Sequence, residues 1–201
     1  GQDLLKAYEI ERRHVGERNR HASYKHANLR MRIRANYDEQ IHACGAEGDA
    51  ARRNYGQLIQ DLGNLENEAW GIEWGYRYDD SPVIWHEDGA APAYDWEEYA
   101  PSSWPGVRPP NVFLEDGTPL FDHLGREFTI LKFGDTDESG LVSAAETAGL
   151  PLKVVSINDP KIKALYERDL VLVRPDQHVA WRGNSAPTDA AAIIDKVRGV
   201  S

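Results

Sequence analysis

The sequence predicts an α/β fold for its C-terminal part, beginning near residue 128. Between residues 128 and 199, short apolar runs typical of buried strands alternate with stretches of helical spacing. Within that part, residues 169–183 (DLVLVRPDQHVAWRG) have the apolar content and the central turn of a β-hairpin. The residues before 128 divide into a helical segment and an irregular, aromatic-rich connector.

Each element of the C-terminal part has local signals of its own. Gly149 is placed to stop the first helix, and Asp159 and Pro160 form an N-cap and a first helical position for the second. In the hairpin, residues 175–177 (PDQ) supply the turn. Strands are expected at 128–134 and 152–157 and in both arms of the hairpin, and helices at 137–149, 159–168 and 186–199.

The resulting order β-α-β-α-β-β-α matches the core of the thioredoxin fold. The first two strands should be parallel, joined by a right-handed crossover, and the last pair antiparallel. A redox-active member carries Cys-x-x-Cys where the first strand meets the first helix. Here residues 134–139 read GDTDES, with three acids and no sulfur, and Cys44 is the one cysteine of the chain. We therefore expect a thioredoxin-like domain over 128–201 that lacks redox cysteines.

Helical spacing dominates the N-terminal segment, residues 1–68. Residues 2–36 should form one long helix and 49–68 a second. The apolar stripe of the long helix is thin, so this helix should need another surface to pack on. Its expected members are Leu4, Leu5, Tyr8, Val15, Leu29, Ile33 and Tyr37, and those of the second helix are Tyr55, Leu58, Leu62 and Leu65.

Basic residues gather on the long helix although the whole chain has a net charge of −10. Within 12–34 a single acid, Glu17, stands among Arg12, Arg13, Arg18, Arg20, Lys25, Arg30, Arg32 and Arg34. Such a run fits either a basic arm for nucleic acid or the solvated face of a helix. The acidic remainder of the chain would repel a phosphate backbone, so we expect no nucleic-acid partner.

Residues 69–127 form the predicted connector, which is rich in aromatic residues and proline. Nine Trp and Tyr residues lie between 70 and 104, and short strands are expected at 75–78 and 82–85. Large aromatic side chains bury much area, so the connector is expected to pack against another surface. An ordinary inter-domain linker is the alternative.

Motif searches assign no chemistry to the chain. It contains no HExxH, no G-x-S-x-G and no glycine-rich phosphate loop, so we assign no catalytic, cofactor-binding or metal-ligating residue. No apolar run is long enough for a membrane span, which predicts no membrane partner. The single cysteine is typical of a reducing compartment, so we expect a cytoplasmic protein.

Four stretches together resemble a known family. Residues 4–19, 75–84, 99–131 and 169–183 are similar, in this order, to the C-terminal third of FAD-dependent aromatic-ring hydroxylases, the single-component flavin monooxygenases of the phenol hydroxylase and polyketide hydroxylase type. The first stretch carries a Tyr-x-x-Glu-Arg-Arg helix that begins at Tyr8. His14 stands where the family often has Pro, and Asn111 where it often has His, so no role that depends on these two side chains is carried over.

The resemblance implies a fragment of a FAD- and NAD(P)H-dependent aromatic hydroxylase (a monooxygenase) whose flavin-binding region precedes this chain. The fragment would serve packing and oligomerisation, would bind no cofactor and would be inactive alone. A homodimer is expected, with Tyr76, Arg77 and Arg108 as interface candidates, because buried Tyr and Arg often dominate interfaces. The alternative is a stand-alone, redox-inactive thioredoxin-like adaptor or dimerisation module.

Overall fold

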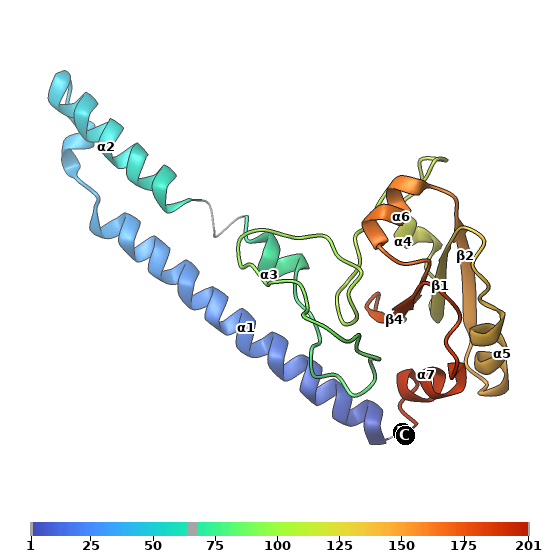
Figure 1. Cartoon of the computed structure of the whole chain (residues 1–201). Coiled ribbons are helices and arrows are strands. Elements are labelled where there is room, and N and C mark those ends of the chain that lie inside the picture. Colours follow the sequence, from blue (N-terminus) through green and yellow to red (C-terminus); the bar gives the residue numbers. More distant parts are fainter. Residues whose placement is uncertain (1, 64–67, 201) are drawn as a thin grey trace.

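A computed structural model describes residues 2–63 and 68–200 of the chain. Its N-terminal segment is a helical hairpin (Figure 1). Helix α1 (Gln2–Ala35) is followed by the short 3-10 helix η1 (Glu39–His42) and by α2 (Ala46–Leu62), which runs back beside the distal half of α1. The hairpin of these helices projects away from the sheet. Both predicted helices are present, and the expected position Leu65 lies outside the described residues.

The C-terminal part is built on a four-stranded mixed sheet. Its strands are β1 (Phe128–Phe133), β2 (Leu152–Ile157), β3 (Leu170–Val173) and β4 (Val179–Gly183), in the order β2-β1-β3-β4. Strands β1 and β2 are parallel, whereas β1 with β3 and β3 with β4 are antiparallel. The predicted pairing directions are thus confirmed for the first two strands and for the hairpin.

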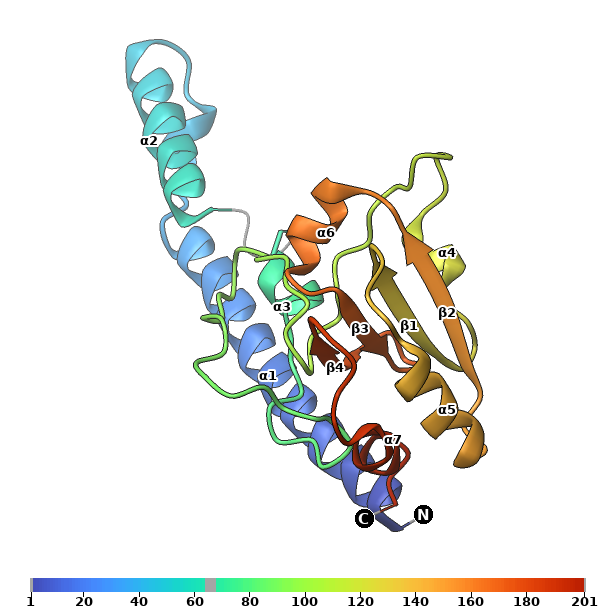
Figure 2. The same cartoon turned by 45° about the vertical axis from the view of Figure 1, so that its right-hand side comes forward.

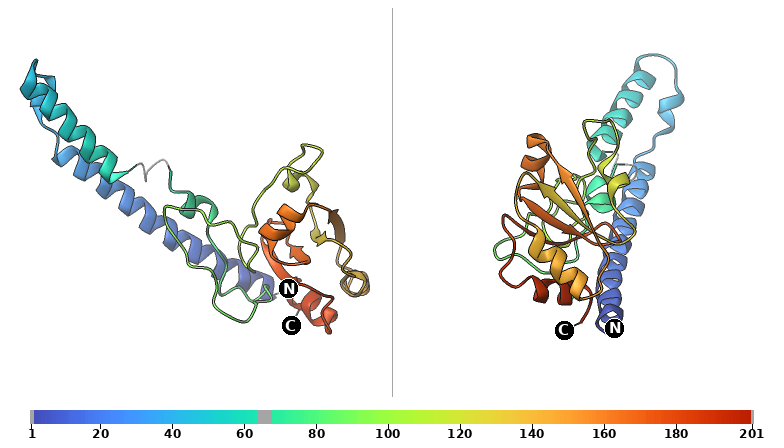
Figure 3. Two further views of the ribbon diagram at one scale, coloured as in Figure 1. Left: turned by 45° about the horizontal axis from the view of Figure 1, so that its top comes forward. Right: turned by 90° about the vertical axis from the view of Figure 1, so that its right-hand side faces the viewer.

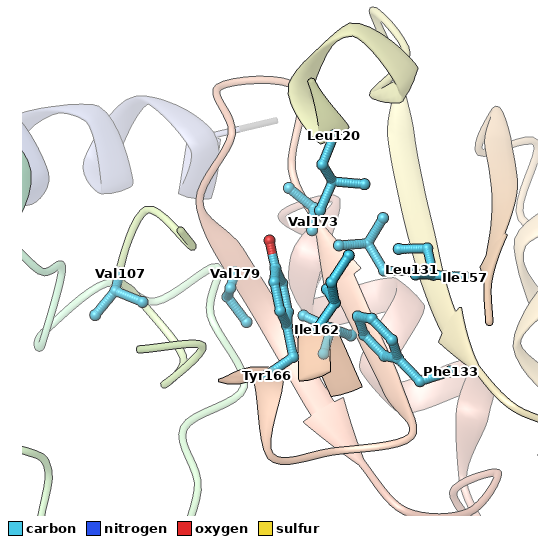
Figure 4. Close-up of a cluster of buried hydrophobic side chains, with 10 residues drawn as sticks. Val107, Leu120, Leu131, Phe133, Ile157, Ile162, Tyr166, Val173 and Val179 are labelled. Atoms are coloured by element: carbon cyan, nitrogen blue, oxygen red, sulfur yellow. The ribbon is translucent and has the colours of Figure 1, made fainter. Parts of the chain in front are cut away.

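Helices cover both faces of this sheet (Figure 2). On one face, α5 (Ser139–Thr147) and α7 (Ala190–Val197) pack on alternate strand residues such as Ile130 and Leu172. On the other face, α6 (Pro160–Tyr166) and the single turn α4 (Leu120–His123) close over Leu131, Phe133 and Val173, with Tyr166 standing beside Phe133 (Figure 4). Successive side chains of each strand point to opposite faces of the sheet, so the strands contribute to two separate apolar clusters.

The cap of α6 matches its sequence signal. The side chain of Asp159 accepts hydrogen bonds from the backbone N–H groups of Lys161 and Ile162, and Pro160 begins α6. Asp189 caps α7 in the same way, through the N–H of Ala192. Helices α5, α6 and α7 begin and end one to four residues inside the predicted ranges.

The connector runs along the β4 side of the sheet. The N–H of Trp85 donates to the carbonyl of Ala180 at 2.8 Å, and Val179 exchanges backbone hydrogen bonds with residues 106 and 107 at 2.8 and 2.9 Å. The expected strands at 75–78 and 82–85 are wrong as regular strands. A single bridge, between Arg77 and Val107, forms in these two ranges. The connector residues bond to each other and to β4 at isolated points, so no continuous ladder develops.

Two further features differ from expectation. A short helix, α3 (Trp70–Trp74), stands where the sequence offered no helical signal. The buried face of α1 is also not the predicted stripe: Leu5 and Tyr8 are 74% and 68% exposed, and of that stripe only Val15 is buried. From residue 4 onward, the buried residues of α1 are Ala7, Glu11, Val15, Arg18 and Ala22, of which two are charged.

Helix α1 begins next to the end of the chain (Figure 3). A side chain built at Gly199, just after α7, would meet the Cγ of Leu4 at 2.8 Å. The first turns of α1 are thereby held against the sheet part, whereas its distal half projects away together with α2 (Figures 1 and 3). No helix in the described part of the chain is both long and apolar enough to cross a bilayer.

Candidate functional site

A buried ion pair joins α1 to the hairpin of the sheet. Both guanidinium Nη atoms of Arg174 donate to the carboxylate of Glu11, at 2.6 and 3.0 Å. The hydroxyl of Ser81, from the connector, donates to the same carboxylate at 2.6 Å. Glu11 is only 6% exposed. Three segments that are distant in sequence therefore meet at one carboxylate, and we call these three residues the Glu11 cluster.

Charges around this cluster reinforce it. Burial by itself would lower the pKa of Arg174, but the bond to Glu11 and the charge of Asp176 raise it above its ordinary value. For Asp176, burial favours the neutral form, whereas the bond from His178 and the charge of Arg174 lower the pKa of the carboxyl below its usual range. Both side chains thus keep their charges in the folded protein.

Aromatic rings pack directly on this charged cluster. The ring of His178 stacks on Tyr78 with centroids 4.3 Å apart, and Tyr76 lies 5.3 Å from the same imidazole. The Nδ1 of His178 lies 3.1 Å from the backbone carbonyl oxygen of Asp176. A carbonyl oxygen can only accept a hydrogen bond, and therefore Nδ1 is the ring nitrogen that donates here. Burial and the neighbouring Tyr76 raise the pKa of Tyr78 to about 12.

A second, partly buried network fixes the connector to β4 and α6. Arg182 on β4 donates from Nε to Glu87 at 2.6 Å and from Nη1 to Ser103 at 2.9 Å. Arg168 also bonds to Glu87, and Glu167 accepts from Arg182 at 2.8 Å. Burial raises the pKa of Glu87, but the bonds from Arg182 and Arg168 outweigh it and hold the pKa below its ordinary value. These five residues are the Arg182 cluster.

The three interface candidates all make contacts within the chain. Tyr76 lies beside Tyr78 and His178, and Arg77 pairs with Asp79 and donates to the carbonyl of Pro92 at 3.0 Å.

Arg108 donates from Nε and Nη2 to the side-chain carbonyl of Gln177, at 3.1 and 2.5 Å. Its guanidinium also lies 4.9 Å from the ring centroid of Trp74. Tyr76 thus joins the rings on the hairpin, and Arg108 lies against the hairpin turn and α3. Arg77 forms a backbone bridge with Val107, the residue before Arg108.

The junction of β1 and α5 does not fit a dinucleotide phosphate. A pyrophosphate site needs free backbone N–H groups and no competing acid at the start of the helix. Here the carboxylate of Asp137 accepts a hydrogen bond from the N–H of Ser139 at 2.9 Å. The Nζ of Lys132 donates to the carboxylate of Glu138 at 2.6 Å. Among the described residues, no group of three or more His, Cys, Asp or Glu side chains is arranged to hold a metal ion. Cys44 is exposed between η1 and α2.

Sequence comparison agrees with the resemblance carried by the four stretches. Residues 102–199 match the family described as aromatic-ring hydroxylase, C-terminal. The chain matches the C-terminal part of the FAD-dependent aromatic-ring hydroxylases. An FAD-dependent monooxygenase of Penicillium oxalicum, opdD, is 31% identical over 92% of this chain and 37% of its own length. Phenol 2-monooxygenase of a Pseudomonas species is 31% identical over 75% of this chain and 28% of its own.

Solved structures show the same partial coverage. A structure described as native and K252c-bound RebC-10x superposes on all of this chain with a TM-score of 0.86 and 36% identity, and only 38% of that protein is covered. The flavin-dependent monooxygenase PieE, solved with FAD and substrate, has the same fold, with a TM-score of 0.78. The chain spans a little over a third of the length of the curated relatives that match nearly all of it.

Sequence reasoning missed the buried charged residues of both clusters. Glu11 lies in the first family-like stretch and Arg174 in the last, so both motifs were visible. Their pairing was not visible, because 163 residues separate them along the chain. A buried carboxylate among arginines also has the sequence signature of a solvated helix face.

Proposed function

We propose that this chain is the C-terminal part of a FAD- and NAD(P)H-dependent aromatic hydroxylase and that it provides packing surface rather than catalysis. The observation that carries the proposal is the two-sided character of α1. One side is fixed to the sheet part through Glu11 and Arg174, whereas the other exposes Leu5, Tyr24 and Met31. Exposed apolar side chains on a firmly held helix are suited to receive another part of the same protein.

The proposed division is a helical segment over 1–68, a connector over 69–127 and a thioredoxin-like domain over 128–201. The strand order β2-β1-β3-β4, with two helices on one face and α6 on the other, supports this assignment. The junction that would carry redox thiols instead holds Asp137 and Glu138 in local hydrogen bonds. We propose that the fold is used here for its shape, in the cytoplasm.

Flavin chemistry is assigned to the parts of the hydroxylase outside this chain. When bound there, FAD supplies the oxidation, and the residues described here hold α1 in place. Flavin titration of the purified chain tests this: we expect no saturable micromolar binding, since the β1–α5 junction does not fit a phosphate. Binding of one FAD per chain would contradict the proposal.

The coding sequence upstream of Gly1 distinguishes this proposal from a stand-alone adaptor. We expect it to encode a G-x-G-x-x-G strand-turn-helix and a Gly-Asp flavin motif. Expressed as a separate polypeptide, that region should form a complex with this chain. Reversal of the charge at Glu11 should weaken the complex, because Arg174 then loses its partner on α1.

A homodimer of the chain is the second part of the proposal. The exposed side of α1 should be covered when the flavin region is absent, most simply by a second copy. Size-exclusion chromatography with light scattering is expected to give about twice the chain mass of 22.6 kDa. Replacing Tyr76, Arg77 or Arg108 by Ala tests their interface role, and a monomeric wild-type chain would contradict the dimer.

A further inference from the structure

A cavity of about 280 Å³ lies where the middle of α1 meets the connector. Helix α1 contributes one wall through His14, Glu17, Arg18 and His21, which share one helical face. The connector forms the other walls with residues from 76–79 and from 94–96.

Arg18 is the distinctive residue of this cavity. Its side chain is only 6% exposed, and its guanidinium carbon lies 5.7, 4.8 and 5.9 Å from the ring centroids of Tyr76, Tyr94 and Trp96. Cation–π contacts with these rings offset part of the cost of burying the charge.

The hydrogen bonds of Arg18 do not satisfy its charge. Nη2 donates to the carbonyl of Gly71 at 2.6 Å, and Nη1 has only a 3.5 Å contact with Asn19. Nε has no hydrogen-bond partner in the described part of the chain, and none of the carboxylates described there pairs with the guanidinium. A buried cation without a counter-charge is costly, so the site is electrostatically incomplete.

The second arginine of the cavity is already satisfied. Arg77 forms an ion pair with Asp79 and donates to the carbonyl of Pro92 at 3.0 Å. Glu17 adds a negative charge at the wall without pairing with Arg18. No carboxylate in the described part of the chain neutralises Arg18, and a bound anion would supply the missing counter-charge.

We propose that this cavity binds a small planar anion, an aromatic carboxylate of one or two rings. The carboxylate would bond to Arg18, since charge-assisted bonds to guanidinium are strong and directional. The ring would lie against Tyr94 and Trp96, where offset or edge-on packing is favourable. The volume of about 280 Å³ lies just below the usual range for ligand pockets, about 300–1,000 Å³, which limits the ligand to one or two rings.

The direct test is a titration of the full 201-residue chain with 2-naphthoate. Calorimetry should show saturable binding of one molecule, and ¹H–¹⁵N NMR should show a shift of the Arg18 Nε–H signal. The neutral analogue 2-naphthylmethanol should bind roughly tenfold more weakly, or about 1.4 kcal/mol. Cyclohexanecarboxylate, an anion without a planar ring, should also bind more weakly.

Substitutions separate the two parts of the site. Arg18→Gln should weaken 2-naphthoate binding at least about tenfold, and Trp96→Leu by several-fold, whereas Glu17→Gln should strengthen it. Arg13→Gln is the matched control, since Arg13 lies on the same helix, is 68% exposed in its side chain and does not line the cavity. Its affinity should equal that of the wild type.

Three results would each overturn the proposal. They are the absence of saturable 2-naphthoate binding at millimolar concentration, equal affinity for the acid and the alcohol, and equal weakening by Arg13→Gln and Arg18→Gln. If Arg18→Gln does not fold, the Nε–H shift and the Trp96→Leu titration decide the outcome by themselves.

Discussion

The buried pair between Glu11 and Arg174 has a measurable consequence for stability. Glu11→Gln keeps the shape of the side chain and removes its charge. The wild-type carboxylate accepts three hydrogen bonds, two from Arg174 and one from Ser81. Breaking one side of a buried pair typically costs 3–5 kcal/mol, because the remaining charge stays buried without its partner. We take about 3 kcal/mol, since Asp176 still faces Arg174 at 2.8 Å in the variant.

The measurement is a double-mutant cycle with Glu11→Gln and Arg174→Met, followed by urea unfolding. The coupling free energy should reach about 2 kcal/mol, and the single change at Glu11 should lower the melting temperature by roughly 6–12 °C for a chain of this length. Circular dichroism reports α1, and tryptophan fluorescence reports the sheet part and the connector.

The same helix contains a matched control pair. Glu9 and Arg13 approach to 2.5 Å, but their side chains are 67% and 68% exposed. An exposed pair of this kind is worth about 0.5 kcal/mol. A coupling energy at the Glu11–Arg174 pair no larger than that of the Glu9–Arg13 pair would refute the reasoning, because burial would then make no difference.

Further predictions concern pH and close contacts. Folding lowers the pKa of Glu87, so the contribution of its carboxylate to the free energy of unfolding is complete above the ordinary pKa of 4.5 and is lost as pH falls through the lower folded pKa. Glu87→Gln should therefore reduce the loss of stability that urea unfolding measures at acid pH. The pKa of Tyr78 is raised to about 12 from 10.0, so its contribution is lost as pH rises between these values, and Tyr78→Phe should remove that loss. A Cβ at Gly71 would lie 2.1 Å from the carbonyl oxygen of Asp95, so Gly71→Ala should destabilise the chain by more than about 2 kcal/mol. Gly56→Ala meets nothing within 4 Å inside α2 and should stabilise it by about 0.8 kcal/mol, as thermal unfolding of both variants would show.

Local chemistry made the sheet part predictable from the sequence. Strand β2 has the predicted bounds, and α6 begins at the predicted Pro160 behind its Asp159 cap. In each case the deciding interaction lies within a few residues of the signal: a cap bond to the next N–H groups, or the switch from a period of two to helical spacing. The order of these elements then restricted the sheet to few topologies.

The candidate site could not be predicted in the same way, because its interactions are distant in sequence. Arg182 meets Glu87 across 95 residues, and Glu11 meets Arg174 across 163. On α1, charged residues at positions 11 and 18 belong to the buried face, which a search for apolar spacing excludes. Helix α3 escaped prediction for a related reason: Gly71 and Gly75 weaken helical propensity, and the contacts that hold it come from α1 and the connector.

Both charged clusters include residues of the connector, and these residues decide what the clusters contribute. Ser81 completes the Glu11 cluster, and Glu87 and Ser103 complete the Arg182 cluster. Replacing buried ion pairs with apolar residues of equal volume is often neutral or stabilising, so stability alone does not explain these charges. A charged cluster with directional bonds to three segments accepts one arrangement of them, whereas an apolar contact accepts several. We infer that the Glu11 cluster chiefly fixes the angle of α1 against the sheet, whereas the Arg182 cluster fixes the connector to β4 and α6. A fixed angle is the property that a helix placed to receive another part of a hydroxylase requires.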